Sequence, residues 1–461
     1  MQAYDVVVLG AGTGGYATAL RAAQLGLSTA LVERDDRLGG TCLLRGCIPT
    51  KALLQSAAVM DEVNRSEEFG IKASGEPDWS GVQAFKTKVV DKTVKGLTGL
   101  VKSRKIDVIK GNGRLAGRGQ VIVEGEDGAR TLTANHVVVA TGSRPKLLPG
   151  LQVSERIITS DEALELDRIP ASAIVIGAGA VGVEFASLWR SLGAEVTIVE
   201  ALPRLVPLED EQLSKELARA LRKRGITSNT GAKVEDVTET GEGVAVRFAV
   251  DGKADTVSAE ICLIAVGRGP VTDGASLEAA GVRLDRGFVQ VDGQLRTTAE
   301  NVWAVGDVVP TLALAHVSFA EGIAVAERIA GNDVPDIDYA GICRVTYCAP
   351  EVASVGLTEA QAKERGHDVV TTTFSLQGLA KANIVGGGGS AKLVAERGGP
   401  ILGVHLLGPH VTDFIAEGML ITNWEAVPEE VASLIHPHPT LSEAIGEAAL
   451  SLAGKPFHAG H

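Results

Sequence analysis

VVVLGAGTGG, residues 6–15, is a short apolar run followed by a glycine-rich turn. The run has the length of a buried strand, and the first glycine permits a tight turn that a bulkier residue resists. The later glycines allow a pyrophosphate and a helix to approach the backbone closely. The stretch therefore predicts a strand, a turn and a helix whose N-terminus faces a phosphate group.

This pattern occurs twice, because Ile174-Val175-Ile176-Gly177 opens a second copy. Four residues of the first copy, Gly10, Gly12, Gly15 and Glu33, recur 167 positions later as Gly177, Gly179, Gly182 and Glu200. A second strand, at 29–32 or 196–199, precedes each glutamate, whose carboxylate can accept hydrogen bonds from ribose hydroxyls. Glycines that serve only as turns would not explain two copies with matching acidic ends. The sequence predicts two dinucleotide-binding folds.

A cysteine pair, CLLRGC at residues 42–47, follows the first glycine turn by about thirty residues. The pair could be two ordinary cysteines of the hydrophobic core, but a dinucleotide site nearby favours redox chemistry. Residues five apart in a regular helix have Cα atoms about 8.6 Å apart, and a disulfide needs less than about 7 Å. We therefore expect a distorted turn at Gly46, a regular helix only after Pro49, and lowered cysteine pKa values near a helix N-terminus.

Composition restricts the class of protein. The 461 residues suffice for about three domains, and the formal net charge of -13 disfavours nucleic acid or an anionic membrane surface as partner. A strand expected at 4–9 leaves no room for a signal peptide, and the apolar stretch 171–183 is shorter than the about 20 residues of a membrane span. Five cysteines are too few and odd in number for a secreted disulfide framework. We expect a cytoplasmic protein.

Several further stretches carry recognisable patterns. Residues 130–139 suggest a pair of strands before Ala140-Thr141-Gly142, and 302–307 suggest a strand that ends in Gly-Asp before a helix at about 316–330. With these motifs, the chain resembles the flavin-dependent pyridine nucleotide-disulfide oxidoreductases along nearly its whole length, and among them the members that oxidise dihydrolipoyl groups. The matching segments are 39–42, 46–51, 140–142, the second glycine motif, 304–307, 314–316, 350–359 and 436–443. One departure is Leu44-Arg45, where the family most often has Asn-Val.

The resemblance implies an α/β fold with two Rossmann-like dinucleotide-binding domains and a C-terminal α+β dimerisation domain. The expected boundaries are 1–148 for an FAD-binding domain with the redox disulfide and 149–270 for an NAD-binding domain. A central segment, 271–340, would complete the FAD site, and 341–461 would form the dimer interface.

The resemblance also assigns catalytic roles. Cys42 would exchange with a substrate dithiol, and Cys47 would pass electrons to the flavin. His438 and Glu443 would form an acid–base dyad, since thiol–disulfide exchange needs a base for the incoming thiol. A surface turn and a His436-x-His438 metal site are the other interpretations of this stretch, and the second lacks further ligands. In a homodimer, this dyad would complete the active site of the other subunit.

The resemblance also assigns residues to the two cofactor sites. The FAD site would contain Gly10, Gly12, Gly15, Glu33, Arg34, Gly40, Thr41, Lys51, Thr141, Gly142, Ser143, Asp307 and Ala315. The NAD site would contain Gly177, Gly179, Gly182, Glu184, Glu200 and Gly267. Lys51 and Glu184 are expected to pair, although two solvated helix charges are the alternative. Glu200 favours NAD because its carboxylate repels a 2′-phosphate, whereas Arg204 leaves NADP open. No metal is expected.

The implied reaction oxidises dihydrolipoyl groups through a Cys42–Cys47 disulfide and reduces NAD. A lipoyl-bearing protein of a 2-oxo acid dehydrogenase complex, or of glycine cleavage, would be the partner. The main alternative is an NAD(P)H-dependent reductase of a low-molecular-weight disulfide. A mercuric reductase is disfavoured because the C-terminal stretch carries no cysteine pair. A non-catalytic flavoprotein is a third possibility, against which the cysteines and the dyad argue.

Overall fold

The computed structural model describes residues 2–117 and 119–458, and the chain divides into two compact units. Unit 1 comprises Met1–Leu53, Ser80–Lys146 and Gly267–Tyr339. Unit 2 comprises Leu54–Trp79, Leu147–Val266 and Ala340–His461.

Unit 1 is built on a mainly parallel sheet with the strand order β3-β2-β1-β6-β5-β4, in which β19 also pairs with β6. Its strands are β1 (Gln2–Leu9), β2 (Thr29–Glu33), β3 (Asp107–Lys110), β4 (Asn112–Leu115), β5 (Gln120–Gly125), β6 (Gly128–Val139) and β19 (Val302–Ala304). Its helices include α1 (Thr13–Gln24), α2 (Gly40–Arg45), α4 (Trp79–Ser103) and α8 (Ala315–Ile329), while α3 (Cys47–Asn64) continues into unit 2. Short strand pairs are β7 (Ser143–Pro145) with β16 (Arg268–Pro270) and β17 (Leu284–Asp285) with β18 (Phe288–Val289).

Strand alternation gives this sheet two buried faces. Val6 and Val8 of β1 pack in the cluster that contains residues of α1, α4 and α8, whereas Val7 and Leu9 pack in the cluster on the opposite face. A parallel sheet covered on both faces needs such continuous apolar strands. The run at 6–9 is therefore the centre of unit 1.

One strand expectation is wrong. Residues 130–139 belong to a single strand, β6, and not to a pair of strands. Residues 128–133 pair with β5, and the apolar end pairs with β1 and β19 on its two sides. The polar first half and the apolar second half of this one strand therefore gave the sequence pattern expected of two short strands.

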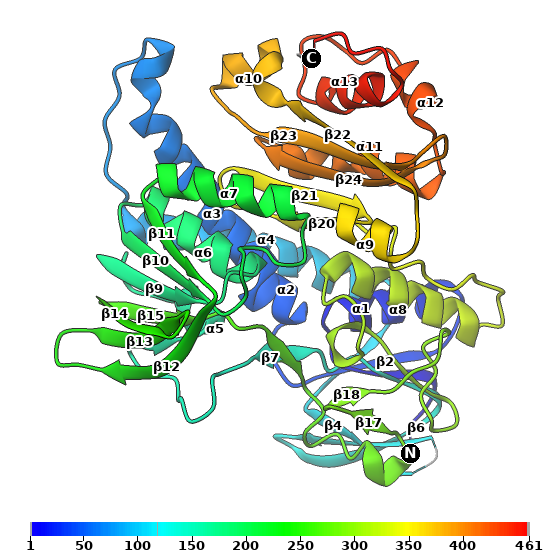
Figure 1. The fold of residues 1–461 in the computed structure, drawn as a ribbon. Helices are drawn as coiled ribbons and strands as arrows, with labels where there is room; N and C mark the ends of the chain where they lie inside the picture. Colours follow the sequence, from blue (N-terminus) through cyan, green and yellow to red (C-terminus); the bar gives the residue numbers. More distant parts are fainter. Residues whose placement is uncertain (1, 118, 459–461) are drawn as a thin grey trace. The chain divides into compact units, whose positions relative to one another are not determined.

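Unit 2 repeats the dinucleotide fold with a parallel sheet in the order β11-β10-β9-β15-β8. Its strands are β8 (Ile157–Ile158), β9 (Ser172–Ile176), β10 (Glu195–Glu200), β11 (Ile226–Thr230) and β15 (Ile261–Ile264). Beside it lie α5 (Ser160–Ala163), α6 (Ala180–Ser191) and α7 (Glu211–Lys223), with α6 and α7 along β9 to β11 (Figure 1). An antiparallel meander of β12 (Ala232–Glu239), β13 (Val244–Val250) and β14 (Lys253–Ala259) packs through Val246 and Phe248 against Ile174 and Ile176.

The C-terminal part of unit 2 is an antiparallel sheet with the order β20-β21-β24-β23-β22, seen in yellow and orange in Figure 1. The strands are β20 (Arg344–Thr346), β21 (Glu351–Gly356), β22 (Val369–Ser375), β23 (Ser390–Glu396) and β24 (Ile401–Gly408). The helices are α9 (Glu359–Glu364), α10 (Ala380–Val385), α11 (Val411–Asn423), α12 (Pro428–Ala432) and α13 (Glu443–Leu452). The predicted α/β class, with two Rossmann-like folds and a C-terminal α+β part, is confirmed.

The third glycine of each repeat is required for helix packing. A Cβ atom at Gly15 would lie 1.8 Å from the carbonyl oxygen of Gly10, and one at Gly182 would lie 2.0 Å from that of Gly177. Both contacts are with backbone, so no side chain can move to relieve them. Each helix can reach its strand only because these two positions lack a side chain.

Gly15→Ala and Gly182→Ala are each expected to destabilise their unit by about 3 kcal/mol or more, at or beyond the upper range for an overpacked core. Gly96→Ala is the matched control, because Gly96 lies inside α4 with open space around it. Removing this helical glycine should stabilise the protein by up to about 1 kcal/mol. Urea unfolding followed by circular dichroism measures all three. Similar effects at Gly15 and Gly96 would contradict the packing argument.

A buried ion cluster joins the two parts of unit 2. The Lys392 Nζ atom of β23 lies 3.0 Å from Oδ1 of Asp210 and 2.6 Å from Oε2 of Glu359, and the Lys392 and Asp210 side chains are only 4% and 3% exposed. Asp210 also caps α7 by accepting the Gln212 N–H. Burial opposes the charged form, but the Lys392 ammonium group and the charge of His405 outweigh it and hold the pKa of Asp210 below its usual value.

Lys392→Met should cost about 3–5 kcal/mol of unfolding free energy at pH 7, because it leaves a buried carboxylate without its cation. Since the pKa of Asp210 is lowered, its contribution is present above the ordinary value of 3.8 and is lost as the pH falls. The gap between wild type and variant should therefore shrink below about pH 4. Lys363→Met removes the exposed Lys363–Glu359 pair and should cost less than about 1 kcal/mol. Equal losses of unfolding free energy in Lys392→Met and Lys363→Met, measured by urea unfolding, would refute the argument from the buried ion cluster.

Candidate active site

The two glycine turns have the same backbone geometry. Gly10 and Gly177 have φ angles of +102° and +105°, in the left-handed region that favours glycine. Gly12 and Gly179 are the N-caps of α1 and α6, with φ angles of -69° and -70°. A glycine N-cap offers no side chain to the first helical N–H groups, so these groups can bind a phosphate. Both turns therefore fit a dinucleotide.

The glutamate at the end of each repeat makes the same two hydrogen bonds, one at each carboxylate oxygen. In the first, Glu33 accepts the Ala11 N–H at 2.7 Å and the Asp35 N–H at 2.9 Å. In the second, Glu200 accepts the Ala178 N–H at 2.5 Å and the Leu202 N–H at 2.7 Å. Each carboxylate is thus fixed beside its glycine turn and retains lone pairs for ribose hydroxyls.

The cysteine turn is broken at Gly46, as expected. α2 ends at Arg45, Gly46 has non-helical angles of -150° and -110°, and a Cβ atom there would lie 2.9 Å from the carbonyl oxygen of Thr41. The expectation that the next helix begins after Pro49 is wrong, since α3 begins at Cys47. Pro49 lies in the first helical turn, where its missing N–H group costs nothing.

The cysteine turn rests directly on the first glycine turn. Gly39 donates its N–H to the Ala11 carbonyl at 2.9 Å. Gly40 has a φ angle of +56°, and a Cβ atom there would lie 2.5 Å from the Gly12 Cα. The structure therefore brings the two cysteines to the glycine turn of unit 1.

Both cysteines are thiols in the structure, and the expectation of a lowered pKa is wrong for Cys42. A hydrogen bond with Cys47 and burial raise the pKa of the Cys42 thiol well above its ordinary value, against the opposing charge of Lys51. Cys42 lies in a short helix, whose dipole is too weak to reverse these effects. Asp307 also acts on this thiol, so Lys51 and Asp307 lie near the redox pair.

Asp307 belongs to a network that joins three segments of unit 1. It follows β19, in the short helix η3 (Gly306–Val308), and accepts the Ser143 hydroxyl at 2.5 Å. Arg268 donates to that hydroxyl at 2.8 Å and to the Ser143 carbonyl at 2.9 Å, and it also contacts the Thr41 hydroxyl at 3.5 Å. The predicted residues Thr41, Ser143 and Asp307 are thus brought together, and Arg268 was missed.

The remaining predicted FAD residues also lie in unit 1. Thr141 donates its hydroxyl to the Val271 carbonyl at 2.5 Å, and Gly142 has a φ angle of +72°. Ala315 is the first residue of α8. Arg34 is about half exposed and lies 4.0 Å from Asp35.

Sequence reasoning also missed Glu321, which is fully buried in α8. Its carboxylate accepts the Gly306 N–H at 2.6 Å, the Thr311 hydroxyl at 2.7 Å and the Tyr339 hydroxyl at 3.0 Å. Glu321 therefore holds the turn that presents Asp307. An acidic residue at helical spacing from the small or apolar residues Ser318, Ala324 and Val325 was the available signal.

The predicted contact between His438 and Glu443 is present in unit 2. The His438 Nδ1 atom lies 2.9 Å from Oε1 of Glu443, and Oε2 accepts the Thr440 N–H at 2.7 Å. Burial opposes ionisation, but these bonds outweigh it, and the pKa of Glu443 lies below its usual value. An ionised carboxylate can only accept, so Nδ1 carries the proton and Nε2 of the exposed ring is left as a base.

The metal interpretation of the two histidines finds no support. His436 binds its own carboxylate, Glu417, at 2.7 Å. Within residues 2–117 and 119–458, no group of three or more potential ligands is arranged to hold a metal ion. The same residues include no helix that is long and apolar enough to cross a membrane.

Three further residues concern the predicted nicotinamide site. Glu184 is buried in α6 and accepts the Tyr347 N–H at 3.0 Å. Its pairing with Lys51 would join the two units and stays a prediction. Gly267 lies where the chain returns from unit 2 to unit 1. Arg204 donates to the Pro207 carbonyl at 2.8 Å, within its own loop, so its guanidinium group is already engaged.

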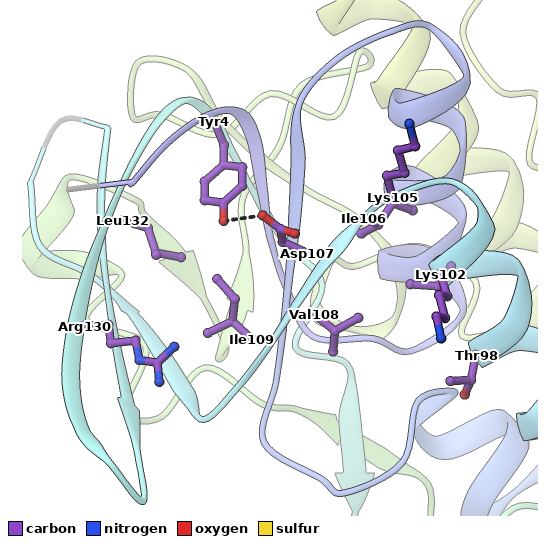
Figure 2. Close-up of a pocket in the computed structure, with 11 residues that line it drawn as sticks. Tyr4, Thr98, Lys102, Lys105, Ile106, Asp107, Val108, Ile109, Arg130 and Leu132 are labelled. Atoms are coloured by element: carbon purple, nitrogen blue, oxygen red, sulfur yellow. Dashed lines mark hydrogen bonds between the residues drawn. The ribbon is translucent and has the colours of Figure 1, made fainter.

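A separate open pocket of about 580 Å³ lies at the other end of the unit 1 sheet (Figure 2). Tyr4 and Asp107 meet there through a hydrogen bond of 2.8 Å, beside Lys102 and Lys105. None of the predicted site residues lines it. The two lysines stand at the C-terminal end of α4, where cations offset the helix dipole. The pocket is therefore distinct from the candidate active site.

Comparison with known proteins agrees with this geometry. Residues 4–322 match the family model for pyridine nucleotide-disulphide oxidoreductases, and residues 342–449 match the dimerisation domain of that family. The dihydrolipoyl dehydrogenase of Bacillus subtilis is 44% identical over 99% of both chains, and that of Rhizobium etli is 40% identical over 99% of this chain and 100% of its own.

Among solved structures, LpdA from Mycobacterium tuberculosis superposes with a TM-score of 0.90 at 28% identity, covering 98% of this chain and all of its own. The HOCl-induced flavoprotein disulfide reductase RclA from Escherichia coli gives 0.88 at 26% identity, covering 97% and 99%. The chain belongs to the pyridine nucleotide-disulphide oxidoreductase family.

Proposed function

We propose that this protein is an NAD-dependent dihydrolipoyl dehydrogenase, a flavoprotein that oxidises dihydrolipoyl groups and reduces NAD. The observation that carries the proposal is the redox turn, in which Cys42 and Cys47 contact each other beside the glycine turn of a dinucleotide fold. The relatives described above, at 40–44% identity over nearly the whole chain, support the substrate. Their length matches this chain, so the similarity extends through both cofactor folds.

FAD would be held in unit 1 by the first glycine turn, Glu33 and Asp307, and NAD in unit 2 by the second turn and Glu200. When bound, FAD supplies a two-electron carrier between the dithiol and NAD. A carboxylate at Glu200 disfavours a 2′-phosphate, and the Arg204 guanidinium group is turned toward the Pro207 carbonyl of its own loop. NAD is therefore favoured over NADP.

The protein's own groups would carry the thiol chemistry. In the oxidised enzyme, one thiolate of the substrate attacks Sγ of Cys42, which breaks the Cys42–Cys47 bond and leaves Cys47 as a thiolate. The second substrate thiol then attacks the substrate sulfur of the mixed disulfide. This forms the cyclic substrate disulfide and releases Cys42, whose Sγ takes up the proton of that thiol. Two electrons have then moved from substrate to cysteines, and His438 Nε2 has accepted a substrate proton. Glu443 stabilises the resulting imidazolium ion.

A homodimer follows from the dimerisation domain at 342–449. Trp424, Leu434 and Ile435 of this region are 74%, 59% and 98% exposed, and apolar surface of this extent marks an interface. Ile435 immediately precedes the stretch with the dyad. We place the dyad of one subunit at the cysteines of the other, a lipoyl-bearing protein of a 2-oxo acid dehydrogenase complex or of glycine cleavage as partner, and the enzyme in the cytoplasm.

Steady-state turnover with dihydrolipoamide and NAD tests the proposal. His438→Ala should lower kcat by about 10²–10⁴-fold, the range for losing a general base, and Cys47→Ser should abolish turnover. The matched control is His458→Ala, since His458 binds Glu447 at 2.8 Å in a similar pair outside the proposed dyad. It should retain activity.

The second candidate is an NAD(P)H-dependent reductase of a small disulfide, which the similarity to the reductase RclA favours. Slow oxidation of dihydrolipoamide together with rapid NADPH-dependent reduction of a disulfide would replace our proposal with that one. Full turnover in Cys47→Ser would exclude both.

A further inference from the structure

Arg45 lies inside the redox turn, between the two cysteines. It is the last residue of α2, directly before Gly46. Its guanidinium group forms an ion pair with the carboxylate of Asp35, and the two side chains are 37% and 27% exposed. Arg45 therefore makes a defined contact and is not a freely solvated charge.

Asp35 connects this ion pair to the first nucleotide fold. Its backbone N–H donates to Oε1 of Glu33 at 2.9 Å, and Oε2 of the same carboxylate accepts the Ala11 N–H of the glycine turn at 2.7 Å. Arg45 also acts on Glu33 electrostatically, since its charge helps to oppose the rise in pKa that burial causes at this carboxylate. A short chain of contacts thus leads from the redox turn to the proposed ribose carboxylate.

The second nucleotide fold shows that the general fold does not require this pair. Glu200 makes the same two backbone bonds, to Ala178 and Leu202. The counterpart of Asp35, 167 residues later, is Leu202, which has no charge to offer. The acidic side chain occurs only in the repeat that carries the cysteines. Its role is therefore connected with the redox turn.

We propose that the Arg45–Asp35 ion pair positions the redox turn against the adenosine end of the first nucleotide site, so that Arg45 is a positioning residue for cofactor binding. Segment 34–45 is then held at two points: at its middle by the contacts of Gly39 and Gly40 with the glycine turn, and at its end by the ion pair of Arg45 with Asp35. Cofactor binding at Glu33 therefore orders the cysteine turn, and an ordered cysteine turn in return strengthens cofactor binding. The inference rests on the proposed function, because it takes the first fold as the FAD site.

A double-mutant cycle on the purified full-length protein tests this coupling. The variants are Arg45→Gln, Asp35→Asn and the double variant, with FAD affinity measured by flavin fluorescence on titrating the apoprotein. Each single variant should raise the Kd for FAD by about two- to fivefold at low salt, the range for a partly exposed ion pair. The double variant should lose no more than either single variant, because both remove one interaction. In 1 M NaCl, where the screening length is about 3 Å, the differences should largely disappear.

Two further variants separate positioning from stability. Arg45→Lys keeps the charge and should restore most of the affinity. Arg37→Gln is the matched control, because Arg37 lies in the same segment and pairs with Asp91 of α4 at 2.6 Å, both side chains being exposed. It should leave the Kd for FAD unchanged. Thermal unfolding of the apoproteins should be the same for all variants.

Amide hydrogen exchange gives a readout that does not need the cofactor. Exchange in residues 33–46 of the apoprotein should be faster in both single variants and unchanged in Arg37→Gln. Additive effects in the cycle, or unchanged affinity and exchange in both single variants, would overturn the inference. Wild-type protein that binds no FAD would instead overturn the proposed function, and the exchange data would still report on the coupling.

Discussion

The close approach of Gly40 to Gly12 is the constraint on which the site depends. A Cβ atom at Gly40 would lie 2.5 Å from the Gly12 Cα, so the cysteine turn can rest on the nucleotide turn only because Gly40 has no side chain. Gly39 adds a hydrogen bond to Ala11 at the same point. Proximity of the cysteines to a cofactor is therefore a property of the backbone. Side chains refine it.

Charges of opposite sign complete this arrangement. Glu33, Asp35 and Arg45 form one connected group at the adenosine end, while Asp307 and Lys51 act on the Cys42 thiol at the redox end. In the reduced pair, the hydrogen bond between the sulfurs and burial keep Cys42 protonated. This thiol is therefore suited to receive or release a proton with the substrate. The proposed base for the substrate proton, His438, lies 2.9 Å from Glu443 in unit 2.

Sequence reasoning succeeded where chemistry is encoded by spacing. The repeat of glycines and glutamates predicted two folds that agree to the level of individual hydrogen bonds, at Glu33 and at Glu200. The break at Gly46 and the contact between His438 and Glu443 also followed from nearby residues. It failed where packing decides the outcome. The pKa of Cys42 depends on a hydrogen bond with Cys47 and on burial, the single strand β6 on its pairing with β1 and β19, and the role of Glu321 on the burial of one face of α8.

By itself, the sequence determined the two nucleotide folds, the redox pair and the dyad, because each is specified by residue types at short, regular intervals. Only the tertiary structure decided which charges meet. Arg45 and Asp35 are ten residues apart, yet their contact depends on the turn at Gly39 and Gly40 that folds the segment back. Arg204 seemed free to bind a phosphate until its loop showed the guanidinium group bonded to the Pro207 carbonyl. Side-chain direction is set by packing, which spacing along a chain does not record.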